Sequence, residues 1–307
     1  MQAHVIIATK GRAGHVRELL DWLSLQTLQP ASVLVVGVTQ ADVEGVAGTP
    51  YAKGGSVQVL LTGDAGLCLQ RNAGIEHLLD SGLVGSGRES SFVTFFDDDF
   101  RPAFDWLQKC RDTFIAQADV SALTGRVLAD GAHGANLTDD DAVAYIERKR
   151  QPARHWASGE EERSLASMYG CNMAFRDLVI RQCRFDENLP LYGWQEDQDY
   201  TAQAKRFGRT IYTPVCRGVH LGSKSGRVSG LRFGYSQIAN PLYLTRKGTM
   251  GLRKTARFVL RHLLANTAQG VRTHPQVDYR GRLRGNLMAL VDCLRGRCHP
   301  RRVLELR

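Results

Sequence analysis

Three consecutive aspartates, Asp97 to Asp99, directly follow the apolar run 92–96. A short run of aromatic and β-branched residues is typical of a buried strand. Open α/β sheets bind their ligands at the carboxyl ends of the strands, where these carboxylates would lie. Crowded carboxylates stay ionised most easily beside a cation, and oxygen ligands favour Mg²⁺ or Mn²⁺. The pattern therefore predicts a site for a divalent metal and for the phosphates that such a metal carries.

A second triple aspartate, Asp139 to Asp141, has a different setting. It follows Thr138 and precedes the apolar stretch 142–146. Threonine is a favourable N-cap, and acidic side chains in the first turn complement the helix dipole. This pattern predicts the start of a helix, so three aspartates in a row do not by themselves indicate a metal site.

A second acidic cluster, Glu196 and Asp197, lies beside two aromatic residues, Tyr192 and Trp194. A carboxylate at this place could act as a general base that activates a hydroxyl nucleophile, and the aromatic rings could stack on a sugar. Acidic residues also favour the first turn of a helix without taking part in any chemistry. Both interpretations stay open on this segment alone.

Two further positions carry basic side chains that suit phosphates. His220 ends an apolar stretch and leads into a Gly/Ser/Lys loop, where Lys224 and Arg227 could contact phosphates. His220 itself could complete a metal shell. Arg71 stands near the start of an expected helix and could pair with a phosphate. Each of these signals is weak when taken alone.

The elements expected around these residues alternate between strands and helices. Strands are expected at 4–8, 32–38, 57–61 and 92–96, and helices after residue 12, at 66–79 and from Pro102 onward. This alternation predicts an α/β fold with a mixed, mainly parallel sheet and helices on both faces. Further along we expect strands at 120–127 and 168–175, a helix at 195–207, and short extended pieces at 210–214 and 215–221. The polar stretch 128–167 is expected to be a surface excursion or lid.

The positive charge of the chain is concentrated near its C-terminus. The 307 residues carry a net charge of +9, and residues 246–307 contain 15 basic residues against three acidic ones. We therefore expect two domains, residues 1–245 and a basic helical extension of residues 246–307. Apolar residues make up 43% of the chain, no run is long enough to span a membrane, and the seven cysteines are scattered. The N-terminus lacks a signal-peptide pattern, and these features predict a cytoplasmic protein.

The extension shows an apolar stripe at helical spacing beside a ladder of arginines, Arg253, Arg257 and Arg261. The stripe contains Leu252, Ala256, Val259, Leu260, Leu263 and Leu264. Basic amphipathic helices of this kind lie on anionic membrane surfaces, which predicts a peripheral protein at the inner face of the plasma membrane. The alternative is a helix that packs on the main domain with its basic face in water. Nucleic acid is not expected as a partner, because aromatic residues are sparse among the basic ones.

Taken in order, the segments resemble the family 2 glycosyltransferases with the GT-A fold. They read strand-Thr-x-x-Arg, Arg-Asn-x-Gly-Ile, Phe-x-x-Phe-Asp-Asp-Asp, Gly-Cys-Asn-Met-Ala-Phe-Arg, Phe-Asp-Glu-x-Leu, Glu-Asp-x-Asp and Val-His-x-Gly. The resemblance covers residues 3 to 230. It implies a GT-A (Rossmann-like) fold and inverting transfer of a sugar from a nucleotide-diphosphate sugar to a hydroxyl of a glycan or lipid-linked acceptor, as in bacterial polysaccharide biosynthesis.

The resemblance also assigns roles to residues. It implies Asp197 as the general base with Glu196 beside it, and a Mn²⁺ or Mg²⁺ ion bound by Asp97, Asp99 and His220. The nucleotide-sugar would be bound by a larger group: Thr9, Arg12, Arg71, Asn72, Asp97, Asp98, Gly170, Asn172 and Trp194.

One position departs from the family pattern. The acidic residue that usually follows the second strand and contacts the nucleobase is missing, and only Asp42 stands nearby. A UDP-sugar is the donor we expect, ahead of GDP and dTDP. Two other functions remain: a sugar-nucleotide nucleotidyltransferase, which would need a Gly-rich basic loop after the first strand, and a non-catalytic nucleotide- or sugar-binding protein.

Overall fold

The computed structural model describes residues 1–85, 90–133, 136–224, 229–271 and 277–306. The chain forms two compact units, each made of several stretches of sequence. Unit 1 comprises residues 1–65, 69–184 and 203–226, and unit 2 comprises residues 66–68, 185–202 and 227–307.

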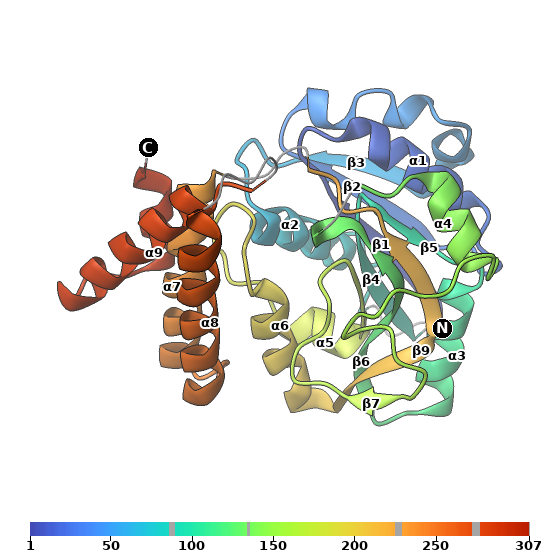
Figure 1. Ribbon diagram of the computed structural model, residues 1–307. Coiled ribbons are helices and arrows are strands. Elements are labelled where there is room, and N and C mark those ends of the chain that lie inside the picture. Colours follow the sequence, from blue (N-terminus) through green and yellow to red (C-terminus); the bar gives the residue numbers. More distant parts are fainter. Residues whose placement is uncertain (86–89, 134–135, 225–228, 272–276, 307) are drawn as a thin grey trace. The chain divides into compact units, whose positions relative to one another are not determined.

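Unit 1 is built on a mixed sheet whose strands follow the order β3-β2-β1-β4-β8-β6-β9-β5, with β7 paired to β9. The strands are β1 (Gln2–Ala8), β2 (Ser32–Gly37), β3 (Val57–Leu61), β4 (Ser91–Asp97), β5 (Phe100–Pro102), β6 (Val120–Asp130), β7 (Arg163–Ser164), β8 (Asn172–Arg176) and β9 (Arg209–His220). Strands β3, β2, β1 and β4 run parallel, whereas β8 is antiparallel to both of its neighbours. The α/β prediction is confirmed (Figure 1).

Helices cover the sheet because its strands are apolar on both sides. The helices of this unit are α1 (Ala13–Ser24), α2 (Leu67–Asp80, of which residues 67–68 belong to unit 2), α3 (Trp106–Ala116), α4 (Asp139–Ile146) and α5 (Asp177–Gln182). On one face, Leu19 of α1 and Trp106 of α3 join Val5 and Phe96 of the sheet in a single core. On the other face α2 packs closely on β1, where Gly74 leaves room for Ile6. Short helical turns lie at Gln40–Val43, Val46–Gly48, Ala52–Ser56, Gly131–His133, Lys205–Phe207 and Pro300–Glu305.

The second triple aspartate starts helix α4, as predicted. The Thr138 side chain accepts a hydrogen bond from the Asp141 backbone N–H, and the Asp141 carboxylate accepts one from the Thr138 N–H. Asp139, in the first turn, has a further role. Its carboxylate accepts hydrogen bonds from the Trp22 indole and from the buried Arg101 guanidinium, which ties α4 to the core.

Several boundaries differ from those predicted; β6, for example, runs three residues beyond its expected end, to Asp130. Pro102 ends strand β5 and does not start a helix, because β5 pairs with β9 and α3 begins only at Trp106. The two extended pieces expected around Pro214 form one strand, β9. A register shift places Thr213 opposite Gly125 and Arg217 opposite Arg126, so residues 214–216 bulge and accommodate the proline. Strand β8 begins at Asn172, four residues later than expected.

Unit 2 consists of helices: α6 (Glu196–Ala204, of which residues 203–204 belong to unit 1), α7 (Gly230–Lys247), α8 (Leu252–Gly270) and α9 (Tyr279–Leu294). Gly234 and Gly285 allow α7 and α9 to approach closely, since a Cβ at either position would overlap the opposite backbone. Asn266 of α8 donates hydrogen bonds to Gln237 and Asn286, so a buried amide network joins the three helices. Helix α7 was not among the predicted elements, and it contains Pro241 in its interior.

The apolar stripe of α8 is covered only in part. Val259 and Leu263 pack on the small core of unit 2, whereas Leu252, Leu260 and Leu264 are exposed, as are Arg253, Arg257 and Arg261. Part of the stripe therefore packs within unit 2, and part stays exposed beside the arginines. The described helices include none that is both long and apolar enough to cross a membrane. The domain boundary predicted after residue 245 lies within α7 and stays a prediction.

Candidate active site

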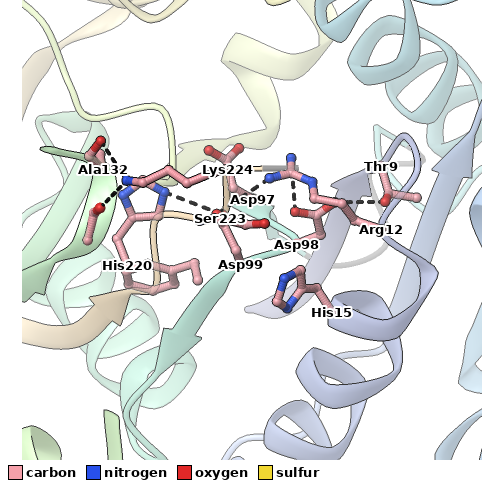
Figure 2. A network of polar contacts seen from close by, with 12 residues as sticks. Thr9, Arg12, His15, Asp97, Asp98, Asp99, Ala132, His220, Ser223 and Lys224 are labelled. Carbon is pink, nitrogen blue, oxygen red and sulfur yellow. Dashed lines mark hydrogen bonds and ion pairs between the residues drawn. The ribbon is translucent and has the colours of Figure 1, made fainter. Parts of the chain in front are cut away.

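The triple aspartate lies at the carboxyl edge of the parallel strands. Ala8 at the end of β1 pairs in register with Asp97 at the end of β4, so the loops that follow both strands start side by side. The first loop carries Thr9 and Arg12, and the second carries Asp98 and Asp99. Figure 2 shows the side chains of both loops directed toward one another. The two loops meet because β1 and β4 are neighbours in the sheet, although they lie far apart in the sequence.

Asp98 is fully buried and is held by the first loop. The Thr9 hydroxyl donates a hydrogen bond of 2.7 Å to one carboxylate oxygen, and the Arg12 guanidinium lies 3.1 Å from the other. Burial raises the pKa of Asp98 to about 7, with repulsion from Asp99 adding to it and Arg12 opposing it. The carboxyl group is thus fixed by the protein's own donors.

Asp99 and His220 meet from neighbouring strands. Phe100 of β5 pairs in register with His220 at the end of β9, which brings the imidazole Nε2 to 3.3 Å from Asp99 Oδ1. The Ser223 backbone N–H donates to the other carboxylate oxygen at 2.8 Å. Burial alone would raise the pKa of Asp99, but His220, Arg12 and this N–H lower it well below its usual range.

The opposite side of the imidazole is held by Asp130 at the end of β6. His220 Nδ1 lies 3.0 Å from Asp130 Oδ1, and the Tyr169 hydroxyl donates to Asp130 Oδ2 at 2.6 Å. Burial alone would lower the pKa of His220, but the carboxylates of Asp99 and Asp130 raise it well above its ordinary value. The imidazole is therefore fixed in orientation, with Nε2 facing Asp99.

The donor atoms of Asp97, Asp99 and His220 lie within 4.8 Å of one another. Two carboxylate oxygens and one imidazole nitrogen form a donor set that suits Mn²⁺. A histidine that ligates a metal usually donates its other ring N–H to a carboxylate, and Asp130 stands at that position. The residues present therefore fit a divalent metal.

Arg71 links the aspartates to the segment before β8. Its buried guanidinium donates to Asp97 Oδ1 and to the Gly170 carbonyl oxygen, both at 3.0 Å. Burial and repulsion from Asp99 raise the pKa of Asp97, while Arg71 opposes this rise. Asn72 is also buried, on the same helix. Asn172 is the first residue of β8, and its side-chain oxygen accepts hydrogen bonds from Thr124 and Gly125 of the neighbouring strand β6.

The remaining predicted residues belong to unit 2. Glu196 is buried and Asp197 half-buried in the first turn of α6, where Asp197 Oδ1 accepts the Gln198 backbone N–H at 2.7 Å. The preceding loop has positive φ angles at two residues that are not glycine, Leu191 (59°) and Gln195 (77°). Such strain persists only where the surroundings impose it and is common at functional sites. The Trp194 ring packs against Phe233, Phe258 and His262.

Three side chains next to the candidate metal group were not predicted: Asp130, His155 and Tyr169. His155 Nε2 lies 3.3 Å from Asp130, and its ring lies 5.3 Å from that of Tyr169. The only signal for Asp130 in the sequence was an Asp-Gly pair at the end of an apolar run. Lys224 donates to the carbonyl oxygens of Gly131 and Ala132, and Arg227 lies outside the described residues. Asp42 accepts the backbone N–H groups of Gly11, Val38 and Thr39.

No protein-family model matches the chain, and neither does any curated protein. Solved structures do match. The S. aureus TarS 1–349 structure in complex with UDP-GlcNAc is 17% identical, with a TM-score of 0.56 over 95% of this chain and 81% of TarS 1–349. The mannosyltransferase PcManGT from Pyrobaculum calidifontis in complex with GDP-Man and Mn²⁺ is 17% identical, with a TM-score of 0.53 over 95% of this chain and 87% of that one.

GalNAc-T7 with UDP, GalNAc and Mn²⁺ is 14% identical, with a TM-score of 0.53 over 82% of this chain and 51% of its own. The chain spans 44% of the longer TarS structure. At these identities the likeness concerns the path of the backbone. Together with the mixed sheet and its flanking helices, it shows that the chain has the fold of the GT-A glycosyltransferases.

Proposed function

We propose that this chain is a metal-dependent, inverting glycosyltransferase of family 2 that moves a sugar from a nucleotide-diphosphate sugar to a hydroxyl group. The observation that carries the proposal is the group formed by Asp97, Asp99 and His220 at the carboxyl edge of a GT-A sheet. The same group is flanked by two arginines, Arg12 and Arg71, which can pair with phosphate oxygens.

In the donor half of the site, Asp97, Asp99 and His220 would hold a Mn²⁺ or Mg²⁺ ion. Such an ion supplies positive charge to the departing diphosphate. Thr9 and Arg12 fix Asp98, so that the loop after β1 keeps its place beside the aspartates. Arg71, Asn72, Gly170 and Asn172 would bind the nucleotide and the donor sugar, as the resemblance implies.

In the acceptor half of the reaction, Asp197 would take the proton from the attacking hydroxyl, and Glu196 would orient the acceptor. This assignment rests on the family resemblance. The half-buried setting of Asp197 and the strained loop before it are features that suit a functional carboxylate. Trp194 would contribute a ring surface for a sugar.

A uridine nucleotide is the donor we propose. The nearest acidic side chain after β2, Asp42, accepts three backbone N–H groups and is buried. Its carboxylate is therefore committed to the loops that follow β1 and β2, and recognition of the base must use other groups. Two similar structures were solved with uridine nucleotides, TarS with UDP-GlcNAc and GalNAc-T7 with UDP.

The acceptor we propose is a glycan or a lipid-linked saccharide at an anionic membrane surface. Helix α8 exposes Leu252, Leu260 and Leu264 together with its arginine ladder, and α9 exposes Leu287, Val291 and Leu294. Exposed leucines beside arginines are typical of helices that lie on anionic bilayers. Substituting Leu260 and Leu264 by glutamate should abolish flotation with anionic vesicles, and flotation at the parent level would contradict this part of the proposal.

A thermal-shift screen of UDP-, GDP- and dTDP-sugars with and without Mn²⁺ tests the main proposal. A ligand that binds the native state raises the melting temperature by mass action, so the cognate donor should stand out only with metal. Hydrolysis or transfer of the sugar, measured as release of the nucleoside diphosphate, should then be lost in Asp99→Asn. Release of pyrophosphate from a nucleoside triphosphate and a sugar phosphate would instead show a nucleotidyltransferase.

A further inference from the structure

A cavity of unit 1, of about 280 Å³, is rich in arginine. It lies among β6, β9, the end of α4 and the segment that follows α4. The residues that matter for its chemistry are Arg126, Tyr145, Arg148, Arg150, Glu160 and Arg217. Four guanidinium groups therefore share one cavity, which has no part in the roles assigned above.

Arg148 occupies a position where glycine is usual. Helix α4 ends with Glu147 as its C-cap, and the N–H groups of Arg148 and Lys149 bond back to the carbonyl oxygens of Tyr145 and Ala144. This pairing is that of a Schellman motif, in which the residue after the cap adopts a left-handed conformation and is most often glycine. Arg148 has a φ of 62°. An arginine in this left-handed conformation makes the folded protein less stable than a glycine would. The Arg148 side chain lines the cavity.

Arg126 is the buried member of the group. Its side chain donates two hydrogen bonds to the Glu160 carboxylate, whereas its buried Nε has no hydrogen-bond partner within the described parts of the chain. Glu160 is 78% exposed, so the pair is open to solvent on one side. The hydrogen bonds from Arg126 lower the pKa of Glu160, and Arg148 adds a smaller attraction. Glu160 thus occupies the place of an anion in the cavity.

The charges of the cavity do not balance. Glu160 pairs with Arg126, and Asp141 pairs with Arg150. Arg148 and Arg217 add two further cations. Guanidinium groups match the planar oxygens of phosphates and carboxylates. An excess of guanidinium inside a cavity therefore favours an oxyanion as its occupant.

We propose that this cavity binds an oxyanion, a phosphate or carboxylate group, carried by a sugar-sized part of the acceptor. Its volume exceeds that of a phosphate alone, and the Tyr145 ring, with the Arg150 guanidinium 5.8 Å from its centroid, adds an apolar surface for a sugar. The cavity is linked to the candidate active site by strand β6, because Arg126 and Asp130, which holds His220, stand four residues apart on it. At a strand rise of about 3.3 Å per residue this separation is at most about 13 Å, which a saccharide can span.

That the oxyanion belongs to a saccharide acceptor rests on the proposed function, whereas the binding of an oxyanion in this cavity does not. Titration calorimetry of the full chain in EDTA, with inorganic phosphate, glucose 6-phosphate and glucose, separates the two. We expect saturable binding of both phosphates, glucose 6-phosphate the tighter, and no binding of glucose. Binding of inorganic phosphate but not of the ester would overturn the acceptor assignment, and no saturable binding of either would overturn the site.

Arg148→Gly is the decisive variant, because glycine suits the backbone there. It should melt no lower than the parent and bind glucose 6-phosphate about tenfold more weakly. Glu160→Gln should bind it more tightly, since it removes the competing carboxylate. Arg206→Gln, which removes an exposed arginine outside the cavity, should bind as the parent does.

Equal affinity of the parent and Arg148→Gly would overturn the proposal, as would equal weakening in Arg206→Gln. Arg217→Gln provides a second test that does not involve the helix end. A parent that binds glucose 6-phosphate in this way but shows no Mn²⁺-dependent binding of a uridine nucleotide would refute the proposed function and leave the oxyanion site standing.

Discussion

Replacing Asp130 by asparagine should weaken Mn²⁺ binding without unfolding the protein. Asp130 lies 3.0 Å from His220 Nδ1 and does not belong to the candidate metal group itself. Its carboxylate fixes the imidazole with Nε2 facing Asp99. It also makes Nε2 a more basic ligand for a metal ion. Loss of such a supporting carboxylate typically reduces metal affinity by about ten- to a hundredfold, which is about 1.4–2.7 kcal/mol.

The structure allows the two contributions of Asp130 to be separated. Asparagine keeps an oxygen that can accept from Nδ1–H but removes the charge, so we expect a loss of about tenfold. Alanine removes orientation as well and should approach about a hundredfold. Either variant also loses part of the bonding to Tyr169 and to the Ala132 N–H, so the free energy of unfolding without metal should fall by about 1–3 kcal/mol.

Mn²⁺ binding can be followed by electron paramagnetic resonance of the free ion, with chemical denaturation measured in parallel. Asp119→Asn is the matched control, because Asp119 pairs with Arg209 on the surface. Unchanged Mn²⁺ affinity in a folded Asp130→Asn variant would refute the reasoning. An equal loss in Asp119→Asn would attribute the effect to overall charge.

Three further results are expected. Asp197→Asn should abolish sugar transfer and leave Mn²⁺-dependent nucleotide binding within about twofold, because the resemblance gives Asp197 a role only toward the acceptor; equal loss of both would contradict that role. Asp186 has a lowered pKa, since hydrogen bonds, with Lys247 foremost, outweigh the effect of burial. Its contribution is present at neutral pH and is lost progressively as the pH falls from about 4 through the lowered native pKa of Asp186, so Asp186→Asn should cost about 1–2 kcal/mol in urea unfolding at pH 7 and less at pH 3. Gly125→Ala would press a Cβ against a carbonyl oxygen of β9 and should cost more than about 2 kcal/mol, whereas Gly14→Ala in helix α1 should be neutral or stabilising.

The parallel half of the sheet could be predicted because its signals are local. The runs that became β1, β2, β3 and β4 are short, apolar and bounded by turn residues, and all were expected within about two residues of their observed ends. The edge on which Asp97 to Asp99 lie followed from strand type alone. The capping pattern of Thr138 was equally local.

Other features depend on contacts between distant residues and could not be predicted. The bulge at residues 214–216 exists because β9 must pair with β6 on both sides of a proline. Helix α7 includes Pro241, which has no N–H to donate to the Gln237 carbonyl oxygen, and contacts from the distant helices α8 and α9 hold it in place: Asn266 donates to the Gln237 side chain and Asn286 to the Gly234 carbonyl oxygen. The contact between Asp130 and His220 depends on the pairing of β6 with β9, because 90 residues separate the two side chains in the sequence.

The interleaving of the two units has a consequence for how the protein is made. The chain passes between the units five times, and the stretch 185–202 has partners in the last third of the sequence, among them Tyr243, Lys247 and Thr249. Asp199, fully buried, pairs with Lys247, and Gln198 donates to the Thr249 carbonyl oxygen. During synthesis, the buried carboxylate of Asp199 in α6 therefore leaves the ribosome 48 residues before the cation that neutralises it. Unit 2 can complete its folding only after α7 has emerged, so ribosome-bound chains ending before residue 247 should expose α6 to proteases.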